Sequence, residues 1–212
     1  MFVSSDVSRK HLEPSKRGMA HGSVSCAVNS RTMAIGATMH TFDIQLADVD
    51  RGVYEDLSLR VAQHPSETDA YMMTRVLAFC LEYEEGISFS SGGVSTGEEP
   101  AILVKDLTGL ITAWIEVGAP DAQRLHLGSK RADRAAVYTH KDPAKLLFAW
   151  RGKTIHQAEN IRVRSFESTF IDDAVRSLTR RNTMSVSVTE GQIYLELNGS
   201  NLQTQFSEHV IE

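Results

Sequence analysis

One stretch in the middle of the sequence constrains the fold more than any other. Two apolar segments, at 98–105 and 110–118, flank the turn sequence Asp-Leu-Thr-Gly and predict an antiparallel hairpin. Pro120 opens a predicted helix that runs to about Arg134, and a short apolar strand follows at 135–139. A strand, helix and strand in this order are expected to form a parallel, right-handed unit. The chain therefore needs a mixed sheet, in which a hairpin continues into a parallel pair.

Antiparallel strands are also predicted near both ends of the chain. Alternating apolar residues over 34–49 and 53–61 predict an opening hairpin around the turn Asp-Val-Asp-Arg-Gly. Between about 183 and 206, turns at Glu-Gly and Asn-Gly separate three segments and predict a meander. Further elements are expected as helices from about 143 and over 167–180, and as a strand over 161–166. The predicted class is mixed α/β, with a central mixed sheet flanked by helices and added antiparallel hairpins at both ends.

The composition excludes several other classes of protein. The chain has 212 residues, of which 42% are hydrophobic, as is usual for a globular protein. No stretch reaches the roughly 18 to 20 consecutive apolar residues of a membrane span. Cys26 and Cys80 lack CxxC spacing and cannot make a disulfide framework, which fits a reducing cytoplasm. A net charge of −5 argues against non-specific coating of nucleic acid, although one basic face could still bind it.

The first 32 residues differ from the rest of the chain. They are rich in Ser, Arg and Lys and show no helical or strand periodicity. They also lack the continuous apolar segment of a secretory signal. We therefore expect residues 1–32 to be a disordered extension and residues 33–212 to form a single domain.

Two glutamates on the middle hairpin are the first candidates for a site. If 107–108 is a two-residue loop, Glu99 lies directly opposite Glu116. A three-residue loop with Gly109 in the left-handed region would bring Glu98 to that face instead. The hydrophobic pattern favours the first register.

Opposed carboxylates repel each other by a few tenths to about 1 kcal/mol, which favours a function for the pair. A divalent cation such as Mg²⁺ or Mn²⁺ would suit them, whereas the alternative is that both point into solvent. Gln123, Arg124 and Lys130 on the following helix could bring cationic and amide groups to phosphate, or could simply form an exposed basic face. Trp114 shares a strand face with Glu116, and could stack on a base or cover the core.

A third acid lies at a predicted helix start. In the sequence His-Pro-Ser-Glu-Thr-Asp, Ser66 is expected as the N-cap and Glu67 in the first turn, and an apolar stripe behind them ends near Gly86. Arg75 follows Glu67 at a helical spacing and is either a reasonable ion-pair partner or just a surface residue. His64 could be catalytic, although a histidine at such a junction more often bonds the backbone.

Several of these residues lie in stretches that resemble a known family. The stretches are Ala-Gln-His-Pro-Ser-Glu-Thr at 62–68, Met-Met-Thr-Arg-Val-Leu-Ala-Phe at 72–79, Glu-Glu-Pro at 98–100, and Trp-Ile-Glu-Val-Gly-Ala-Pro-Asp at 114–121 with Arg124. On these stretches the chain resembles the YaeQ family, small bacterial proteins with a restriction-endonuclease-like fold of the PD-(D/E)xK superfamily. The resemblance runs from about Met33 to the C-terminus.

The resemblance implies a core in which two acids of a hairpin hold Mg²⁺, here Glu99 and Glu116, with Glu67 as an assisting glutamate. The lysine of the motif is absent, because Gly118 stands two residues after Glu116. Lys130 or Gln123 on the next helix could replace it.

These residues support two functional hypotheses. The first is a Mg²⁺-dependent nuclease acting on DNA or RNA, in which Glu67, Glu99, Glu116 and Lys130 are catalytic and Arg124, Gln123 and Trp114 bind substrate. The second is a non-catalytic scaffold that binds nucleic acid or a protein partner, for instance in transcription. Relatives tend to carry Lys or Gln where this chain has Leu127, and this difference favours the second hypothesis.

Overall fold

A computed structural model describes residues 36–90 and 99–211 of the chain. The predicted extension at 1–32 and the alternative site residue Glu98 lie outside the described residues. None of the helices in the described ranges is long and apolar enough to cross a membrane.

The predicted hairpins at the two ends of the chain come together in one sheet. This five-stranded sheet has the order β10-β9-β8-β1-β2. Its strands are β1 (Thr38–Asp48), β2 (Val53–Gln63), β8 (Arg181–Thr189), β9 (Gln192–Leu197) and β10 (Ser200–Gln205). The hairpin and the meander are confirmed, and a parallel pairing of β1 with β8 joins them. Nothing in the local sequence pattern indicates that parallel pairing.

The second sheet is the predicted mixed sheet, with the order β11-β7-β6-β5-β4-β3. Its strands are β3 (Ile87–Phe89), β4 (Ile102–Lys105), β5 (Ile111–Val117), β6 (Arg134–Thr139), β7 (Arg162–Ser165) and β11 (Ser207–His209). The antiparallel hairpin of β4 with β5 and the parallel pairing of β5 with β6 are both confirmed. The short strands β3 and β11 were not predicted.

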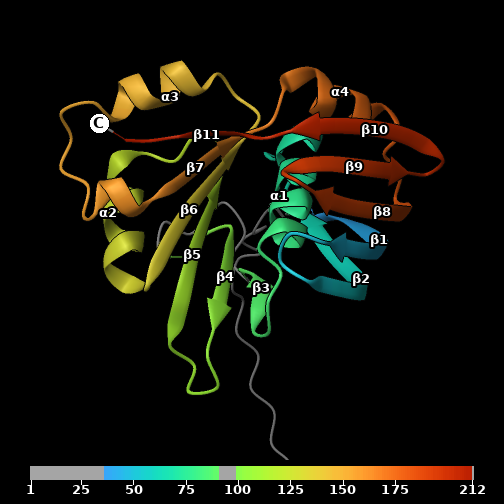
Figure 1. Ribbon diagram of the computed structural model, residues 1–212, viewed down its shortest axis with the longest axis horizontal. Helices are drawn as coiled ribbons and strands as arrows, with labels where there is room; N and C mark the ends of the chain where they lie inside the picture. Colours follow the sequence, from blue (N-terminus) through green and yellow to red (C-terminus); the bar gives the residue numbers. More distant parts are fainter. Residues whose placement is uncertain (1–35, 91–98, 212) are drawn as a thin grey trace, which may run out of the picture. The chain divides into compact units, whose positions relative to one another are not determined.

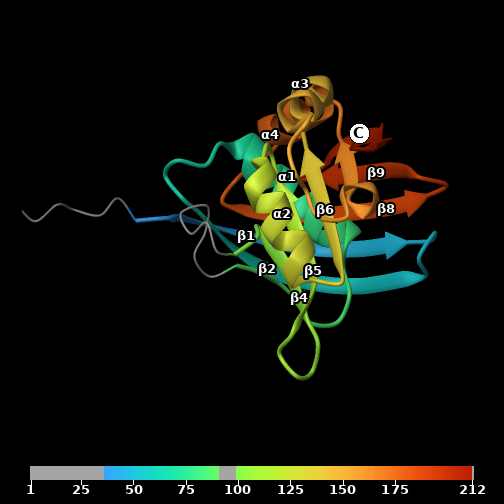
Figure 2. The same ribbon diagram turned by 90° about the vertical axis from the view of Figure 1, so that its left-hand side faces the viewer.

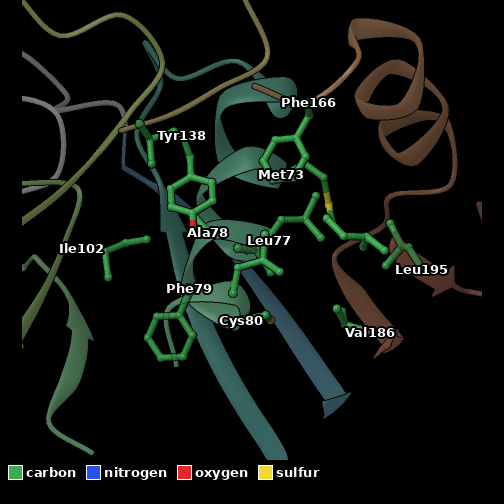
Figure 3. Close-up of a cluster of buried hydrophobic side chains, with 14 of the residues drawn as sticks. Met73, Leu77, Ala78, Phe79, Cys80, Ile102, Tyr138, Phe166, Val186 and Leu195 are labelled. Carbon is green, nitrogen blue, oxygen red and sulfur yellow. The ribbon is translucent and has the colours of Figure 1, made fainter. Parts of the chain in front are cut away.

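One helix lies between the two sheets (Figure 1). The described helices are α1 (Asp69–Leu81), α2 (Ala122–Arg131), α3 (Pro143–Trp150), α4 (Ser168–Arg176) and the short 3-10 helix η2 (Ala158–Asn160). Every residue of α1 from Met72 to Leu81 is buried, because strands of both sheets and α4 contribute to the core around it. Figure 3 shows Leu77 and Phe79 of this helix between Ile102 on one side and Val186 on the other.

The other face of the second sheet is covered by α2 and α3. Figure 2 shows α2 in front of β5 and β6. A second apolar cluster joins these helices to β6 and β7 through Leu125, Val137, Leu146, Trp150 and Val163. The central strands of this sheet are therefore buried on both faces.

The predicted start of α1 is wrong by two residues. The N-cap is Thr68 rather than Ser66, because the Thr68 hydroxyl accepts the backbone N–H of Tyr71 at 3.1 Å. Glu67 therefore lies in the turn before the helix and not in its first turn. The helix also ends earlier than expected, at Leu81 rather than near Gly86.

The predicted register of the β4–β5 hairpin is wrong. Ile102 pairs with Ile115, a displacement of two residues from the predicted pairing, so Glu99 does not lie opposite Glu116. Glu99 in fact precedes β4, which begins at Ile102. The face with Ile102 and Ile115 is buried as predicted, because a displacement of two residues leaves each side chain on its own face. The opposite face is buried as well, since Trp114 is 0% and Glu116 is 3% exposed.

Asp106 explains why the loop is wider than the predicted two residues. Its Oδ1 accepts the backbone N–H groups of Thr108 at 2.8 Å and of Leu110 at 3.0 Å. Gly109 has a φ of +88°, so it adopts the left-handed conformation of the alternative loop. A side-chain acceptor therefore organises this turn, after which Lys105 pairs with Ile111, and an irregularity between Val104 and Lys105 adds the second residue of the displacement.

Candidate functional site

A polar cleft opens where the second sheet presents the ends of two parallel strands. It has a volume of about 350 Å³ and is lined by the turn from Val117 to Asp121, by Glu116, Arg124 and Tyr71, and by Lys141 and Ala101. Glu116 lies near the carboxyl end of β5, and Lys141 follows the carboxyl end of β6. Open α/β sheets bind their ligands at this edge. The position agrees with a binding site.

Glu116 forms the buried wall of this cleft. Its Oε1 accepts the indole N–H of Trp114 at 2.8 Å and the Nε of Arg124 at 3.1 Å. Its Oε2 accepts a second guanidinium nitrogen of Arg124 at 3.1 Å. Burial raises the pKa of the Glu116 carboxyl, and the charge and hydrogen bonds of Arg124 oppose that rise.

The packing of α2 against β5 depends on Gly128. A Cβ on this glycine would lie 2.4 Å from the Cδ1 atom of Trp114, so no other residue type fits without a shift. The helix can therefore approach the strand closely enough to bury the indole completely. Because the Trp114 N–H holds Glu116, Gly128 also fixes the position of the carboxylate. Trp114 is not available to stack on a base in this arrangement and covers the core instead.

Arg124 enters the cleft from the first turn of α2. Asp121 caps this helix, because its Oδ1 accepts the backbone N–H of Arg124 at 2.8 Å. The guanidinium also donates to the backbone carbonyl of Glu99 at 2.8 Å. Arg124 therefore links Glu116 to Glu99, although the two glutamates are not cross-strand partners.

A second buried ion pair acts on a residue of the same cleft, Tyr71. Arg75 Nη2 donates to Glu67 Oε2 at 3.1 Å, which confirms the predicted partnership. The backbone N–H of His64 donates to the same oxygen at 3.2 Å. Burial raises the pKa of Tyr71 to about 12, with opposing effects from Arg75 and Arg124. Both ion pairs are therefore close enough to act electrostatically on one phenol.

Two predicted site residues lie away from the carboxylates. Gln123 and Lys130 are both exposed on α2. Lys130 lies in the last turn of this helix, roughly 9 Å along its axis from Arg124 and about a third of a turn around it. The residue that reaches Glu116 is therefore Arg124, and Lys130 does not replace the lysine of the motif in this arrangement.

Sequence reasoning missed Tyr71 and Lys141. Both come from elements far along the chain from β5, so no local spacing connects them with Glu116. Gly118 carries one usable signal, because its φ is +84° and a Cβ there would lie 3.3 Å from the Tyr71 ring. The glycine at the motif's lysine position therefore makes room for Tyr71.

The carboxylate that a Mg²⁺ ion would use in this cleft is paired with an arginine. This ion keeps several waters and binds to proteins mostly through one or two carboxylates. Within 36–90 and 99–211, no group of three or more His, Cys, Asp or Glu side chains could hold a metal ion. The Glu116 carboxylate is already paired with the Arg124 guanidinium.

Two mixed sheets around a central helix, with a polar cleft at strand ends, define a mixed α/β protein. The chain belongs to the YaeQ family, since the family model described as YaeQ protein matches residues 33–206. It is 29% identical over 180 residues to the uncharacterized protein YaeQ of Escherichia coli (strain K12) and to that of Shigella flexneri, covering 82% of this chain and 97% of each relative.

Two crystal structures resemble this fold. The YaeQ protein from Pseudomonas syringae matches with a TM-score of 0.74 and 29% identity, over 83% of this chain and 97% of that one. The YaeQ protein from Xanthomonas axonopodis pv. citri matches with a TM-score of 0.70 and 27% identity, over 83% and 99% of the two chains. The predicted family and fold class are therefore confirmed.

Proposed function

We propose that the chain is a non-catalytic scaffold that binds nucleic acid at the cleft beside Glu116. The ion pair of Glu116 with Arg124 carries this proposal. A guanidinium neutralises the carboxylate that a metal-dependent nuclease would need for its ion. A buried pair of this kind gives the cleft a fixed wall instead of a metal site.

Three groups of the cleft suit a phosphate group. Lys141 is exposed at the rim and supplies a mobile positive charge. Arg124 is partly exposed, at 24% of its side chain, and extends the positive surface to the wall. Tyr71 lines the cleft as a protonated phenol at neutral pH, so its hydroxyl can donate to an oxygen atom.

The resemblance to the PD-(D/E)xK superfamily supports nucleic acid as the ligand, since those proteins act on DNA or RNA. A cytoplasmic location and a role in transcription are parts of the same proposal. The cleft would then hold a strand without cutting it.

A Mg²⁺-dependent nuclease is the second candidate. One observation favours it: Arg124 joins the carbonyl of Glu99 to the carboxylate of Glu116, so the two acids of the motif are neighbours in space. For this candidate, Arg124 would have to leave Glu116 and the Glu99 side chain would have to turn towards it.

Calorimetric titration of Mn²⁺ and Mg²⁺ separates the two candidates. The wild type, Glu116→Gln and Arg124→Gln are titrated to millimolar concentrations, and cleavage of plasmid and single-stranded substrates is assayed on the same samples. The scaffold proposal predicts no metal binding that depends on Glu116 and no cleavage, together with retention of labelled oligonucleotides by the wild type.

Metal binding and cleavage that both disappear in Glu116→Gln would establish the nuclease instead. A wild type that retains neither single-stranded nor double-stranded oligonucleotides would overturn the scaffold proposal.

A further inference from the structure

A second groove adjoins the cleft beside Glu116. It has a volume of about 440 Å³ and lies between the start of α2 and the length of α3. The two hollows share Lys141 and the turn 119–121. A ligand that occupies the groove therefore reaches the cleft without crossing another element.

The floor of the groove is apolar and firmly held. Trp150 is almost fully buried, and its indole N–H donates to the carbonyl of Pro120 at 2.9 Å. This bond fixes α3 to the turn before α2. Leu146 and two alanines, Ala122 and Ala149, complete the surface. The small side chains leave room for a flat group to lie against the floor.

The rim of the groove carries positive charge. Lys141, Lys145 and Lys153 line it, and in the described part of the chain the sequence has only two further lysines, Lys105 and Lys130. This concentration of lysines contrasts with the net charge of −5 of the whole chain.

The two acidic side chains that line the groove cap the N-termini of α2 and α3. Asp121 accepts the N–H of Arg124, and Asp142 accepts the N–H of Ala144 at 3.0 Å. The ion pair of Lys145 with Asp142 is exposed and long, at 3.8 Å, so it leaves this lysine able to meet a ligand. The rim is therefore suited to a polyanion.

We propose that this groove binds a single-stranded nucleic acid whose backbone continues into the cleft beside Glu116. The inference rests on the proposed function of that cleft. Phosphates lie along the lysine rim. Unstacked bases make apolar contacts with Pro120 and the alanines of the floor, since Trp150 is only 1% exposed and anchors the floor from beneath. A duplex keeps its bases stacked and presents mainly its backbone, so it gains nothing from an apolar floor. The groove therefore favours a single strand over a duplex.

The test measures fluorescence anisotropy of a labelled twelve-residue oligo-dT, an oligo-U of the same length, and a duplex. The double variant Lys145→Gln and Lys153→Gln is compared with the wild type over a range of salt concentrations. We expect its affinity for single strands to fall by about tenfold at low salt, and the slope against salt to decrease by about 1 for each lysine.

Lys105→Gln is the matched control, because Lys105 is exposed at the end of β4 and lines neither hollow. We expect this variant to bind single strands as the wild type does. Thermal unfolding of all variants checks that the substitutions leave the fold intact, which is expected because Lys145 and Lys153 are exposed.

Each of the other results overturns the inference. Wild-type affinity in the double variant would place the nucleic acid outside the groove, while the proposed function of the chain would stand. A duplex bound as tightly as a single strand would remove the role of the apolar floor. Poly-glutamate that competes as well as oligo-dT would make an acidic peptide the ligand. Failure to bind any oligonucleotide would overturn the proposed function as well.

Discussion

Two ion pairs that join a glutamate to an arginine lie near each other, and they differ in how water reaches them. The side chains of Glu67 and Arg75 are 1% and 4% exposed. The side chain of Glu116 is 4% exposed, but that of Arg124 is 24% exposed. The first pair is therefore sealed in the protein, and the second pair is open to a cleft.

The sealed pair connects parts of the fold. Arg75 donates to the carbonyl of Ala62 in β2 at 2.9 Å, and its guanidinium lies 5.3 Å from the centre of the Phe89 ring in β3. These contacts join α1 to both sheets. Glu67 Oε1 and Arg75 Nε have no hydrogen-bond partner in the described part of the protein. A buried acid near a site can therefore act only to stabilise the fold. The exposure of its arginine partner distinguishes this structural role from a role in the cleft.

The largest expected effect comes from breaking the sealed pair. Glu67→Ala leaves the Arg75 charge buried without its counterion, and should lower the free energy of unfolding by about 3–5 kcal/mol. Urea denaturation of wild type and variant measures the loss. A loss below about 1 kcal/mol would show that water reaches Arg75, and would remove the distinction between the two pairs.

The double variant Glu67→Leu and Arg75→Met is the control for this prediction. It removes both charges and keeps apolar volume, so it should recover most of the lost stability. If the double variant is no more stable than Glu67→Ala, the loss comes from packing instead of the unpaired charge.

The next effect concerns the packing of Gly128 against Trp114, the residue that holds Glu116 of the open pair. Gly128→Ala puts a methyl group 2.4 Å from Trp114, and should destabilise the fold by about 1–3 kcal/mol through overpacking. The indole fluorescence should shift as its hydrogen bond to Glu116 is disturbed. Ser129→Ala is the neighbouring control and should leave both quantities nearly unchanged. An unaltered indole signal in Gly128→Ala would contradict the role of this glycine.

A smaller effect is expected at the helix cap that presents Arg124. Asp121→Ala removes the acceptor for the Arg124 backbone N–H, and should cost about 1 kcal/mol. Asp142→Ala removes the equivalent cap of α3 and should cost a similar amount. Thermal denaturation compares the two variants. Both carboxylates line the proposed polyanion groove, so oligonucleotide binding does not distinguish the caps, and an unchanged stability in either variant would contradict its capping role.

The smallest effect is the pH dependence of the open pair. Burial raises the pKa of Glu116 above its ordinary value of 4.5. At pH values between 4.5 and the pKa of Glu116 in the folded protein, the folded protein keeps a proton on Glu116 that the unfolded chain has released. The stabilisation from this group is therefore complete below about pH 4.5, and is lost as the pH rises through the folded pKa.

Glu116→Gln removes that dependence, because an amide has no proton to lose in this range. The variant should gain stability relative to the wild type as the pH rises, and the gain should level off above the folded pKa. Urea denaturation at several pH values from 4 to 8 measures the difference. A difference that is constant with pH would mean that Arg124 fully offsets the effect of burial.

The hairpin of β4 and β5 shows what the sequence can specify. Alternation of apolar residues assigned the buried face correctly, because every even displacement of the strands preserves it. The same property makes the pattern unable to distinguish the observed register from one displaced by two residues. The loop that Asp106 organises displaces the pairing by one residue, and an irregularity between Val104 and Lys105 displaces it by a second. Neither feature is visible in the apolar periodicity.

The candidate site was predictable to a similar extent. Glu116 and Arg124 are close in the sequence, and a strand followed by a tight turn and a helix brings them together. The helical spacing predicted the partnership of Glu67 with Arg75, although Glu67 lies in the turn before α1 and not on the helix itself. Tyr71 and Lys141 reach the cleft through the packing of α1 and the pairing of β6 with β5, so no local pattern could place them.

The parallel pairing of β1 with β8 has a consequence for how the protein is made. Thr41 pairs with Arg181, so most of the chain must leave the ribosome before these strands can meet. Until then the first hairpin exposes the apolar side chains of Phe42, Ile44 and Leu46, which are buried in the finished protein. If translation stops before residue 181, β1 keeps an unpaired edge with exposed apolar side chains, which chaperones and proteases recognise.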